Sequence, residues 1–510
     1  MSAQVLQMLR RAAESNDPEA MLSAGAEAIR AGAEAEALRP VEEILRRSPD
    51  HPRLWQLLGL IHRNLEDHER SLHAFAKAAE LAPEDAMIAH ALACVRYEAG
   101  LPAGRHFEHA MRLDPSDRSI LLRHAAARIA EGREAEAIAG LHEEARRDPL
   151  WVEGHKALAR LRWAAGDRED FAESFETALA AAPRSAPLWR AYVETLMHDE
   201  LHERALAIVE RGRAAAGADP AFDAAEAICR SERGELEAAG ALFRRLAPLR
   251  DVTIIVAYLR FLLRAGRTDE AARIAEKSAS KDPSDQIWPY LSIAWRLLGD
   301  PRWQWLEGHP GFIGVYDIAD AMPPLDSLAD RLRSLHRTAH HPLHQSLRGG
   351  TQTEGHLFQR IEPEIRMLRQ AVVEAVERHV ARLPPPDPSH PLLIRRRSPI
   401  GFSGAWSVRL TGGGRHVDHV HSAAWFSSAL YVALPSEEES GGGDSGWLIL
   451  GQASGLGIDL PPIRRVEPRP GRLVLFPSTM WHGTRPFAAG ERLTVAFDVK
   501  RPGRRIAITP

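Results

Sequence analysis

Cysteine is almost absent from this chain, which has two in 510 residues, Cys94 and Cys229. Both stand in sequence with helical spacing, so they cannot supply the disulfide framework that is typical of small secreted domains. We therefore expect two small buried thiols and no disulfide. We take the cytoplasm as the location of the protein.

Long apolar runs and an excess of basic charge are also missing. No run reaches the length of about eighteen residues that a membrane helix needs, and the N-terminus lacks the apolar core of a signal peptide. The 65 Lys and Arg residues stand against 69 Asp and Glu, which gives a net charge of −4. Without a basic excess the chain is poorly suited to neutralise phosphates. We therefore expect neither a membrane span nor a nucleic-acid partner.

Prolines recur through the first part of the chain at intervals of 28 to 37 residues. Between them, Ala and Leu follow helical spacing, as in 54–62 and 71–79. A period near 34 residues is typical of arrays of helix–turn–helix repeats. Residues 1–300 are therefore predicted to form an α-solenoid. The prolines of the period are Pro49, Pro83, Pro115, Pro149, Pro183, Pro220, Pro248 and Pro283.

The same segment resembles tetratricopeptide repeats. The Leu-Gly pair of that motif falls on Leu58 and Gly59, and its other positions fall on Trp55, Phe75, Ala78 and Pro83. The resemblance implies stacked helix pairs with a concave face that commonly receives peptides or protein segments. In the alternative interpretation the array only builds a homodimer or a rigid spacer.

The repeat pattern fades after Pro283, and residues 301–345 are predicted to be a connector. Its end is polar and carries His340, His341 and His344, which we expect to be solvated loop histidines rather than metal ligands. Such loops lie at the surface or line a site. Arg348 and Gln352, just beyond, are candidates for substrate contacts at a barrel mouth.

From about residue 392 the helical period gives way to the alternation typical of strands. Short strands separated by turn signals indicate a barrel or a double-stranded jelly roll. Helices predicted over 323–335 and 363–381 would flank it. The predicted strands are 403–410, 415–421, 427–434, 447–450, 472–476 and 493–499.

Side chains able to bind a metal gather in this region, at His416, Asp418, His419, His421 and His482. On a strand, alternate residues share a face, so the pair 416/418 would point one way and the pair 419/421 the other. The first pair with His482 would give the facial triad of two histidines and a carboxylate that holds non-haem Fe(II). The second pair would give a triad of three imidazoles. Motif chemistry alone favours the first.

Several stretches resemble the 2-oxoglutarate/Fe(II) oxygenases related to prolyl hydroxylases, and more closely the branch with N-terminal tetratricopeptide repeats. The resemblance covers roughly residues 340–500. The His-x-His of that family falls on His419 and His421, so the resemblance implies that these two and His482 bind Fe(II). His416 and Asp418 remain the alternative first pair. The stretches that carry the resemblance are 345–353, 406–410, 416–421, 425–432, 446–448, 471–478, 481–484 and 492–494.

Arg492 stands ten residues after His482 and leads a strand on which Thr494 shares its face. A guanidinium at this place can bind the distal carboxylate of 2-oxoglutarate through two hydrogen bonds, with the threonine hydroxyl as a further donor. Tyr431 is a candidate donor to the same cosubstrate. Trp425 is predicted, with Arg348 and Gln352, to contact substrate.

The predicted fold is multidomain α + β. It consists of a solenoid of tetratricopeptide-like helix pairs (1–300), the connector (301–345), and a double-stranded β-helix, or jelly-roll, barrel with a supporting helix (346–510). The resemblance implies an Fe(II)- and 2-oxoglutarate-dependent dioxygenase that hydroxylates a side chain of a peptide or protein recruited by the array. Two alternatives remain open. One is a repeat-based adaptor with a vestigial barrel, and the other is a cupin-like metal enzyme that does not use 2-oxoglutarate.

Overall fold

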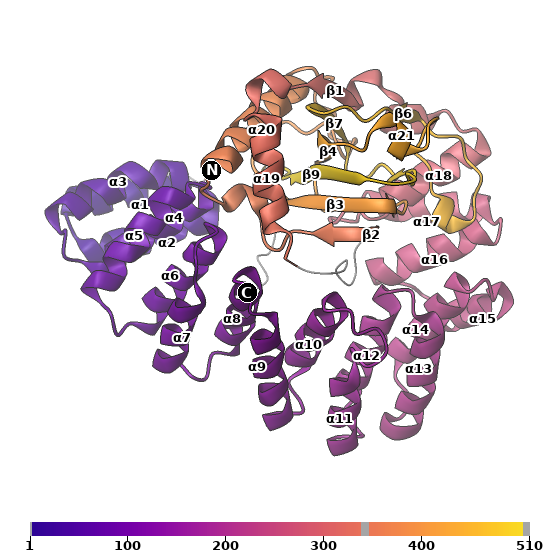
Figure 1. Cartoon of the computed structure of the whole chain (residues 1–510), viewed down its shortest axis with the longest axis horizontal. Helices are drawn as coiled ribbons and strands as arrows, with labels where there is room; N and C mark the ends of the chain where they lie inside the picture. Colours follow the sequence, from indigo (N-terminus) through magenta and orange to yellow (C-terminus); the bar gives the residue numbers. More distant parts are fainter. Residues whose placement is uncertain (1–2, 338–345, 503–510) are drawn as a thin grey trace. The chain divides into compact units, whose positions relative to one another are not determined.

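The computed structural model of the chain describes residues 3–337 and 346–502 (Figure 1). The three histidines predicted in a solvated loop, His340, His341 and His344, lie outside the described residues. The chain divides into two compact units, one with residues 3–137 and 354–369 and the other with residues 138–353 and 370–502. The second unit thus joins later repeats to the strands, whereas the predicted boundaries at 300 and 345 follow the sequence pattern and stay a prediction.

Eighteen α-helices precede the first strand of the described chain. Consecutive helices from α1 to α8 and from α10 to α18 pack against each other as a repeat array requires. This confirms the predicted solenoid. The helices are α1 (Ala3–Ser15), α2 (Pro18–Ala31), α3 (Glu34–Arg47), α4 (Pro52–Asn64), α5 (His68–Leu81), α6 (Ala86–Glu98), α7 (Gly104–Leu113), α8 (Arg118–Ala130), α9 (Glu134–Arg147), α10 (Val152–Ala164), α11 (Glu173–Ala181), α12 (Ala186–His198), α13 (His202–Ala216), α14 (Pro220–Glu232), α15 (Leu236–Leu246), α16 (Val252–Arg264), α17 (Thr268–Ala279) and α18 (Trp288–Leu298).

The prolines of the period lie just after the second helix of a pair, where the missing N–H and the fixed φ prevent the helix from continuing. Pro83 follows α5 and Pro115 follows α7. Pro220 differs, because it is the first residue of α14, where a proline is well tolerated. This difference explains why the spacing is irregular on both sides of Pro220.

Close packing of α4 on α5 depends on a small residue at Gly59. A Cβ atom at Gly59 would lie 2.8 Å from the ring of Phe75, which is fully buried. The hydroxyl of Ser71 donates to the carbonyl of Gly59 over 2.9 Å. The Leu-Gly and Phe positions of the tetratricopeptide resemblance are therefore the points where the two helices touch.

The C-terminal strands form two antiparallel sheets, and a shared core of Tyr431, Leu448, Leu450, Val474 and Phe476 joins them. This confirms the predicted jelly-roll architecture. The six-stranded sheet has the order β1-β7-β4-β9-β3-β2 and the three-stranded sheet the order β6-β5-β8. The strands are β1 (Gly314–Asp317), β2 (Leu347–Gln352), β3 (Phe402–His416), β4 (Phe426–Ala433), β5 (Leu448–Leu450), β6 (Arg464–Val466), β7 (Arg472–Pro477), β8 (His482–Thr484) and β9 (Glu491–Val499).

The two flanking helices lie where the sequence predicts them. They are α19 (Leu325–Leu335), which packs against β4, and α20 (Pro363–Ala381). The ring of His379 on α20 meets Phe426 of β4 edge to face, with ring centroids 4.8 Å apart. The shorter elements are η1 (Gln304–Gly308), η2 (Pro310–Phe312), η3 (Ala319–Ala321), η4 (Leu357–Gln359), α21 (Glu437–Ser440) and η5 (Ser454–Leu456).

The predicted strand 415–421 is wrong. Instead, β3 runs without a break through the three glycines at 412–414, ends at His416, and pairs with β2 and β9 (Figure 1). A Cβ atom at Gly414 would lie 2.6 Å from the carbonyl oxygen of Thr411 and 2.7 Å from that of Gly349. Glycine is thus needed where β2 approaches β3 closely. The strand β2 covers residues for which the sequence predicts no strand.

In the second unit, the last repeat helices and the jelly roll share one core. Tyr290 and Leu291 of α18 belong to the same buried cluster as Leu456 and Trp481. The Trp481 indole donates to the carbonyl of Pro289 over 3.3 Å. The guanidinium of Arg296 donates to the carbonyls of Gly451 and Pro461.

Both cysteines are buried and unbridged, as predicted. Burial raises the pKa of the Cys94 thiol to about 11 and that of Cys229 to about 12. Among the residues that the structure describes, no helix combines the length and the apolar character that crossing a bilayer would take.

Candidate metal centre

Main-chain pairing brings the three histidines onto facing segments. His419 and His482 form an isolated antiparallel bridge, with N–H to carbonyl distances of 2.9 and 3.0 Å. His482 also opens β8, where it lies opposite Leu450 of β5. The N–H of His421 donates to the carbonyl of Ser478 over 2.9 Å. The short distances between these backbones hold the three imidazoles close together.

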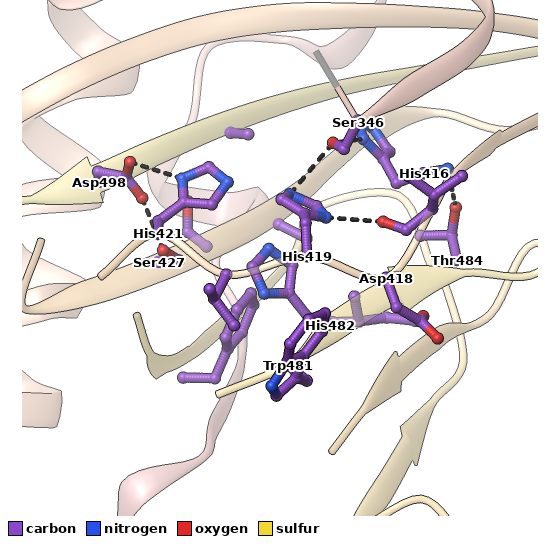
Figure 2. Close-up of a pocket in the computed structure, with 18 of the residues that line it drawn as sticks. Ser346, His416, Asp418, His419, His421, Ser427, Trp481, His482, Thr484 and Asp498 are labelled. Carbon is purple, nitrogen blue, oxygen red and sulfur yellow. Dashed lines mark hydrogen bonds and ion pairs between the residues drawn. The ribbon is translucent and has the colours of Figure 1, made fainter. Parts of the chain in front are cut away.

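Figure 2 shows the rings of His419, His421 and His482 next to one another. The ring centroids of His419 and His482 are 4.1 Å apart, those of His419 and His421 4.9 Å, and those of His421 and His482 5.3 Å. One ring nitrogen of each lies within 4.8 Å of the others. Within 3–337 and 346–502, this is the group of ionisable side chains that could hold a metal ion.

Two of the imidazoles are oriented by main-chain carbonyls. Nδ1 of His419 lies 2.8 Å from the carbonyl oxygen of Val417, and Nδ1 of His482 lies 3.0 Å from that of Met480. An Nδ1–H that donates to a carbonyl fixes the tautomer and leaves the lone pair on Nε2, the atom that can bind a metal. In this structure Nε2 of His419 lies 3.2 Å from the hydroxyl oxygen of Ser346 (Figure 2).

The third imidazole is oriented by a carboxylate. Nδ1 of His421 lies 2.7 Å from Oδ2 of Asp498, and the hydroxyl of Ser427 donates to Oδ1 of Asp498 over 2.6 Å. Burial works to lower the pKa of His421, but the charge and the hydrogen bond of Asp498 outweigh it and raise the pKa. Metal-binding histidines commonly have such a carboxylate partner.

Asp498 is a residue that we did not predict from the sequence, although a signal was present. Arg492, Thr494, Ala496 and Asp498 alternate along β9, and all four line one cavity. Asp498 stands four positions after Thr494, on the face that Arg492 and Thr494 share, so the period of two alone could have assigned it to the site.

The neighbouring pair, His416 and Asp418, is not brought together with His482. Asp418 accepts from the backbone N–H of Ser454 over 2.8 Å and from its hydroxyl over 2.5 Å, and it is turned away from the rings (Figure 2). His416 places Nδ1 3.0 Å from the hydroxyl oxygen of Ser346. The predicted alternation of faces fails here because the strand ends at His416.

Burial determines the charge of the other three histidines, His416, His419 and His482. It lowers the pKa of His419 and of His482 well below the usual value, and neighbouring imidazoles lower both further. Burial, followed by the positive charge of Arg492, lowers the pKa of His416 to about 3. These imidazoles are neutral at physiological pH, the state in which histidine binds metals.

A buried cation lies in the same cavity. The Arg492 side chain is 3% exposed, and its Nη1 donates to the carbonyl of Gly446 over 2.9 Å. Its Nε and the hydroxyl of buried Tyr431 have no hydrogen-bond partner among the described residues, and the guanidinium carbon lies 5.9 Å from the Tyr431 ring centroid. A buried charge and unpartnered donors are costly unless a ligand satisfies them, and an anionic group suits both.

The cavity has a volume of about 470 Å³, within the common range for small-molecule sites. Arg348, Gln352 and Thr494 line it, as do the imidazoles. Trp425 does not line it: that side chain is 2% exposed and its indole donates to the carbonyl of Leu392 over 2.8 Å. Trp425 is therefore a core residue, in contrast to the prediction of a substrate contact.

Residues 404–498 match the family described as "Putative 2OG-Fe(II) oxygenase", and residues 52–85 match the tetratricopeptide repeat family. A search of curated proteins gives no match. The matched 404–498 segment contains His419, His421, His482 and Arg492.

Three solved structures illustrate the similarity of the helical part. YrrB, described as a TPR protein with an unusual peptide-binding site, is 16% identical over 36% of this chain and 96% of its own, with a TM-score of 0.30. A tetratricopeptide repeat protein from Parabacteroides merdae is 16% identical over 47% and 96%, with a TM-score of 0.30. Yeast Tom70 is 17% identical over 57% and 64%, with a TM-score of 0.36. By sequence, this chain thus matches the tetratricopeptide repeat family over residues 52–85 and the family described as "Putative 2OG-Fe(II) oxygenase" over residues 404–498.

Proposed function

We propose that the jelly roll is an Fe(II)- and 2-oxoglutarate-dependent dioxygenase whose metal ligands are His419, His421 and His482. The observation that carries the proposal is a cluster of three imidazoles, each held through Nδ1, in one cavity with the buried cation of Arg492. When bound, Fe(II) and 2-oxoglutarate supply the insertion of one atom of O2 into a substrate C–H bond, with succinate and CO2 as co-products.

The chain's own residues orient the histidine rings, bind the cosubstrate and shield it from solvent. Asp498 holds the His421 ring, while the carbonyls of Val417 and Met480 hold the other two. Arg492 binds the distal carboxylate of the cosubstrate, and the hydroxyls of Thr494 and Tyr431 are its further donors. Because Arg492 is buried, its attraction for a carboxylate is weakened little by solvent.

We further propose that the substrate is a side chain of a peptide or protein. Two observations support this. The chain carries a tetratricopeptide repeat, and repeat residues Arg260 and Tyr290 line the same cavity as the imidazoles. A substrate bound along the repeat helices is therefore within reach of the metal centre. His416 stays outside the ligand set in this proposal and faces the Ser346 hydroxyl.

Anaerobic spectroscopy tests the cosubstrate site. Full-length protein with Fe(II) and 2-oxoglutarate should give a visible charge-transfer band, which Arg492→Ala should abolish while Fe(II) binding persists. Arg409→Ala is a matched control, because Arg409 lies on the neighbouring strand β3 and pairs with Glu491 outside the cavity. If wild-type protein gave no band and formed no succinate in air, the proposal would fail. Succinate formation also separates this activity from a cupin-like enzyme that does not use 2-oxoglutarate, or from an adaptor.

A further inference from the structure

The cavity is lined by the repeat array as well as by the jelly roll. Arg260 of α16, Tyr290 of α18, and His198 and Glu200 at the end of α12 line the same space as the three imidazoles. None of these repeat residues is marked by a motif, since each belongs to the ordinary repeat pattern. Within the second unit, the repeats therefore form part of the wall that a substrate meets.

This wall is fixed to the metal centre. Trp481 precedes the candidate ligand His482, and its ring meets Tyr290 edge to face with centroids 5.7 Å apart. Trp481 is buried in the core shared with α18, and its carbonyl accepts from the N–H of Gly451 over 2.6 Å. Arg296 of α18 in turn donates to the Gly451 carbonyl. The position of the repeat wall and that of the metal centre are thus set by the same contacts.

The charged side chains of the wall already have partners. Arg348 lies 3.3 Å from Glu200, and Arg260 donates to Glu232 over 2.8 Å. Asp418 accepts from Ser454, and Asp498 is paired with His421. The cation that remains, Arg492, is assigned to the cosubstrate. The carboxylate of Asp418 has a neutral partner, but it is turned away from the imidazole rings (Figure 2). Beside those rings a charged substrate side chain would lose its hydration without meeting an unpaired opposite charge, which is strongly unfavourable.

Glu200 occupies a backbone position that is unusual for its residue type. Its φ is 60°, and the equivalent positions two residues beyond α10, α14 and α16 are Gly166, Gly234 and Gly266, also with positive φ. A non-glycine residue is strained in this left-handed region. Glu66, two residues beyond α4, has the same conformation, so the positive φ is not peculiar to the cavity. What distinguishes Glu200 is that it lines the cavity and that its carboxylate meets Arg348 of β2.

We propose that the substrate is an extended polypeptide that crosses this repeat wall and inserts an uncharged side chain into the cavity. The inference rests on the proposed oxygenase function and specifies its substrate. Uncharged hydrogen-bonding groups, including Tyr290, Gln352 and Thr484, line the cavity. The hydroxyl of Tyr290 accepts from Arg260 over 3.5 Å and that of Thr484 accepts from the N–H of His416 over 2.9 Å, so each keeps its own O–H to donate to the peptide main chain. The ion pair of Glu200 and Arg348 leaves the wall without net charge and selects against Lys, Arg, Asp and Glu at the inserted position.

A positional-scanning peptide library tests the inference. Each pool has a fixed central residue and randomised flanks, and is incubated with full-length protein, Fe(II), 2-oxoglutarate and O2. Mass spectrometry measures the gain of one oxygen atom, and succinate is measured in parallel. We expect oxidation only in pools with an uncharged central residue. Equal oxidation of charged and uncharged pools would overturn the inference.

Two variants test the roles of Arg348 and Tyr290. Arg348→Met leaves Glu200 without its cation, and Glu200 is 68% exposed, so pools with a central Lys should become substrates. Tyr290→Phe should raise the peptide KM about fivefold, the effect expected for one lost hydrogen bond. Arg485→Met and Tyr258→Phe are matched controls whose side chains do not line the cavity, and they should change neither result.

The outcomes separate this inference from the function on which it rests. Succinate formation without oxidation of any pool would overturn the polypeptide inference and leave the oxygenase proposal intact. Absence of both succinate and the charge-transfer band would overturn both. An Arg348→Met variant that still rejects central Lys would overturn the role given to the ion pair.

Discussion

Glu307 is a buried carboxyl group whose ionisation should control stability near neutral pH. It lies in the π-helical turn η1 and is 3% exposed. The hydroxyl of Ser292 donates to Oε2 over 2.5 Å, while Oε1 has no partner among the described residues. Burial raises the pKa of Glu307 from 4.5 to about 7, against the smaller opposing effects of the Ser292 hydrogen bond and of Arg296.

The sign of the pH effect follows from proton binding. Between pH 4.5 and 7 the folded chain keeps the Glu307 proton, whereas the unfolded chain has lost it. Folding is therefore favoured at the acid end of this window, and stability falls as pH rises through it. Each pKa unit corresponds to about 1.36 kcal/mol, so a shift from 4.5 to about 7 makes this loss about 3 kcal/mol.

Glu307→Gln should remove this loss, because an amide resembles the protonated carboxyl and does not ionise. We expect urea unfolding midpoints of the variant to fall less between pH 5 and pH 8 than those of the wild type, and the variant to be the more stable protein at pH 8. Glu210→Gln, at an exposed position of α13, is the matched control and should leave the pH dependence unchanged. The reasoning is refuted if wild type and Glu307→Gln show parallel pH profiles.

Three further predictions follow from other contacts. Asp498→Asn should weaken Fe(II) binding about 10- to 100-fold in a metal titration, because it removes the charge that orients His421; unchanged affinity would contradict this role. Trp481→Leu should destabilise the second unit by about 3 kcal/mol in urea unfolding, because it leaves a cavity in the core shared with α18; a change below about 1 kcal/mol would show that this core contributes little. Burial lowers the pKa of His379 to about 4, so the folded chain resists a proton that the unfolded chain accepts at 6.5, and stability should fall by about 3 kcal/mol as pH drops from 6.5 to 4. His379→Gln should flatten that acid limb of the unfolding profile, and an unaltered limb would rule out His379 as its source.

Local patterns in the sequence predicted the helices well. The proline period located the ends of repeat helices, and Pro363–Ala381 is the predicted helix without a change of bounds. Both succeed because helix periodicity and proline chemistry act within a few residues. The irregular spacing at Pro220 was the exception, since proline is accepted both just after a helix and at its first turn.

The strands around the candidate metal centre were harder to predict, because their limits depend on partners far away in sequence. Gly412 and its neighbours indicated a bend, yet β3 continues through them because β2 needs glycine at its closest approach. The predicted alternation of faces does not apply to Asp418, because the strand ends at His416 and Asp418 lies beyond it. The family resemblance that points to His419 and His421 does not depend on strand limits. In the structure His419 lies opposite His482 in an isolated bridge, and the role of these histidines as metal ligands stays a prediction.

The core shared by the repeats and the jelly roll could not be predicted from the sequence either. Trp481 belongs to a stretch that resembles the oxygenase family, but its burial comes from α18, a helix that ends more than 180 residues earlier in the chain. The sequence separates the repeat helices from the jelly roll because their hydrophobic periods differ. In the structure the two regions share one core, which contains both Trp481 and Tyr290. A residue beside a candidate metal ligand is thus held by a repeat helix, so a substitution in α18 that leaves every motif untouched can still alter the position of His482. The repeats therefore belong to the physical description of the candidate metal centre.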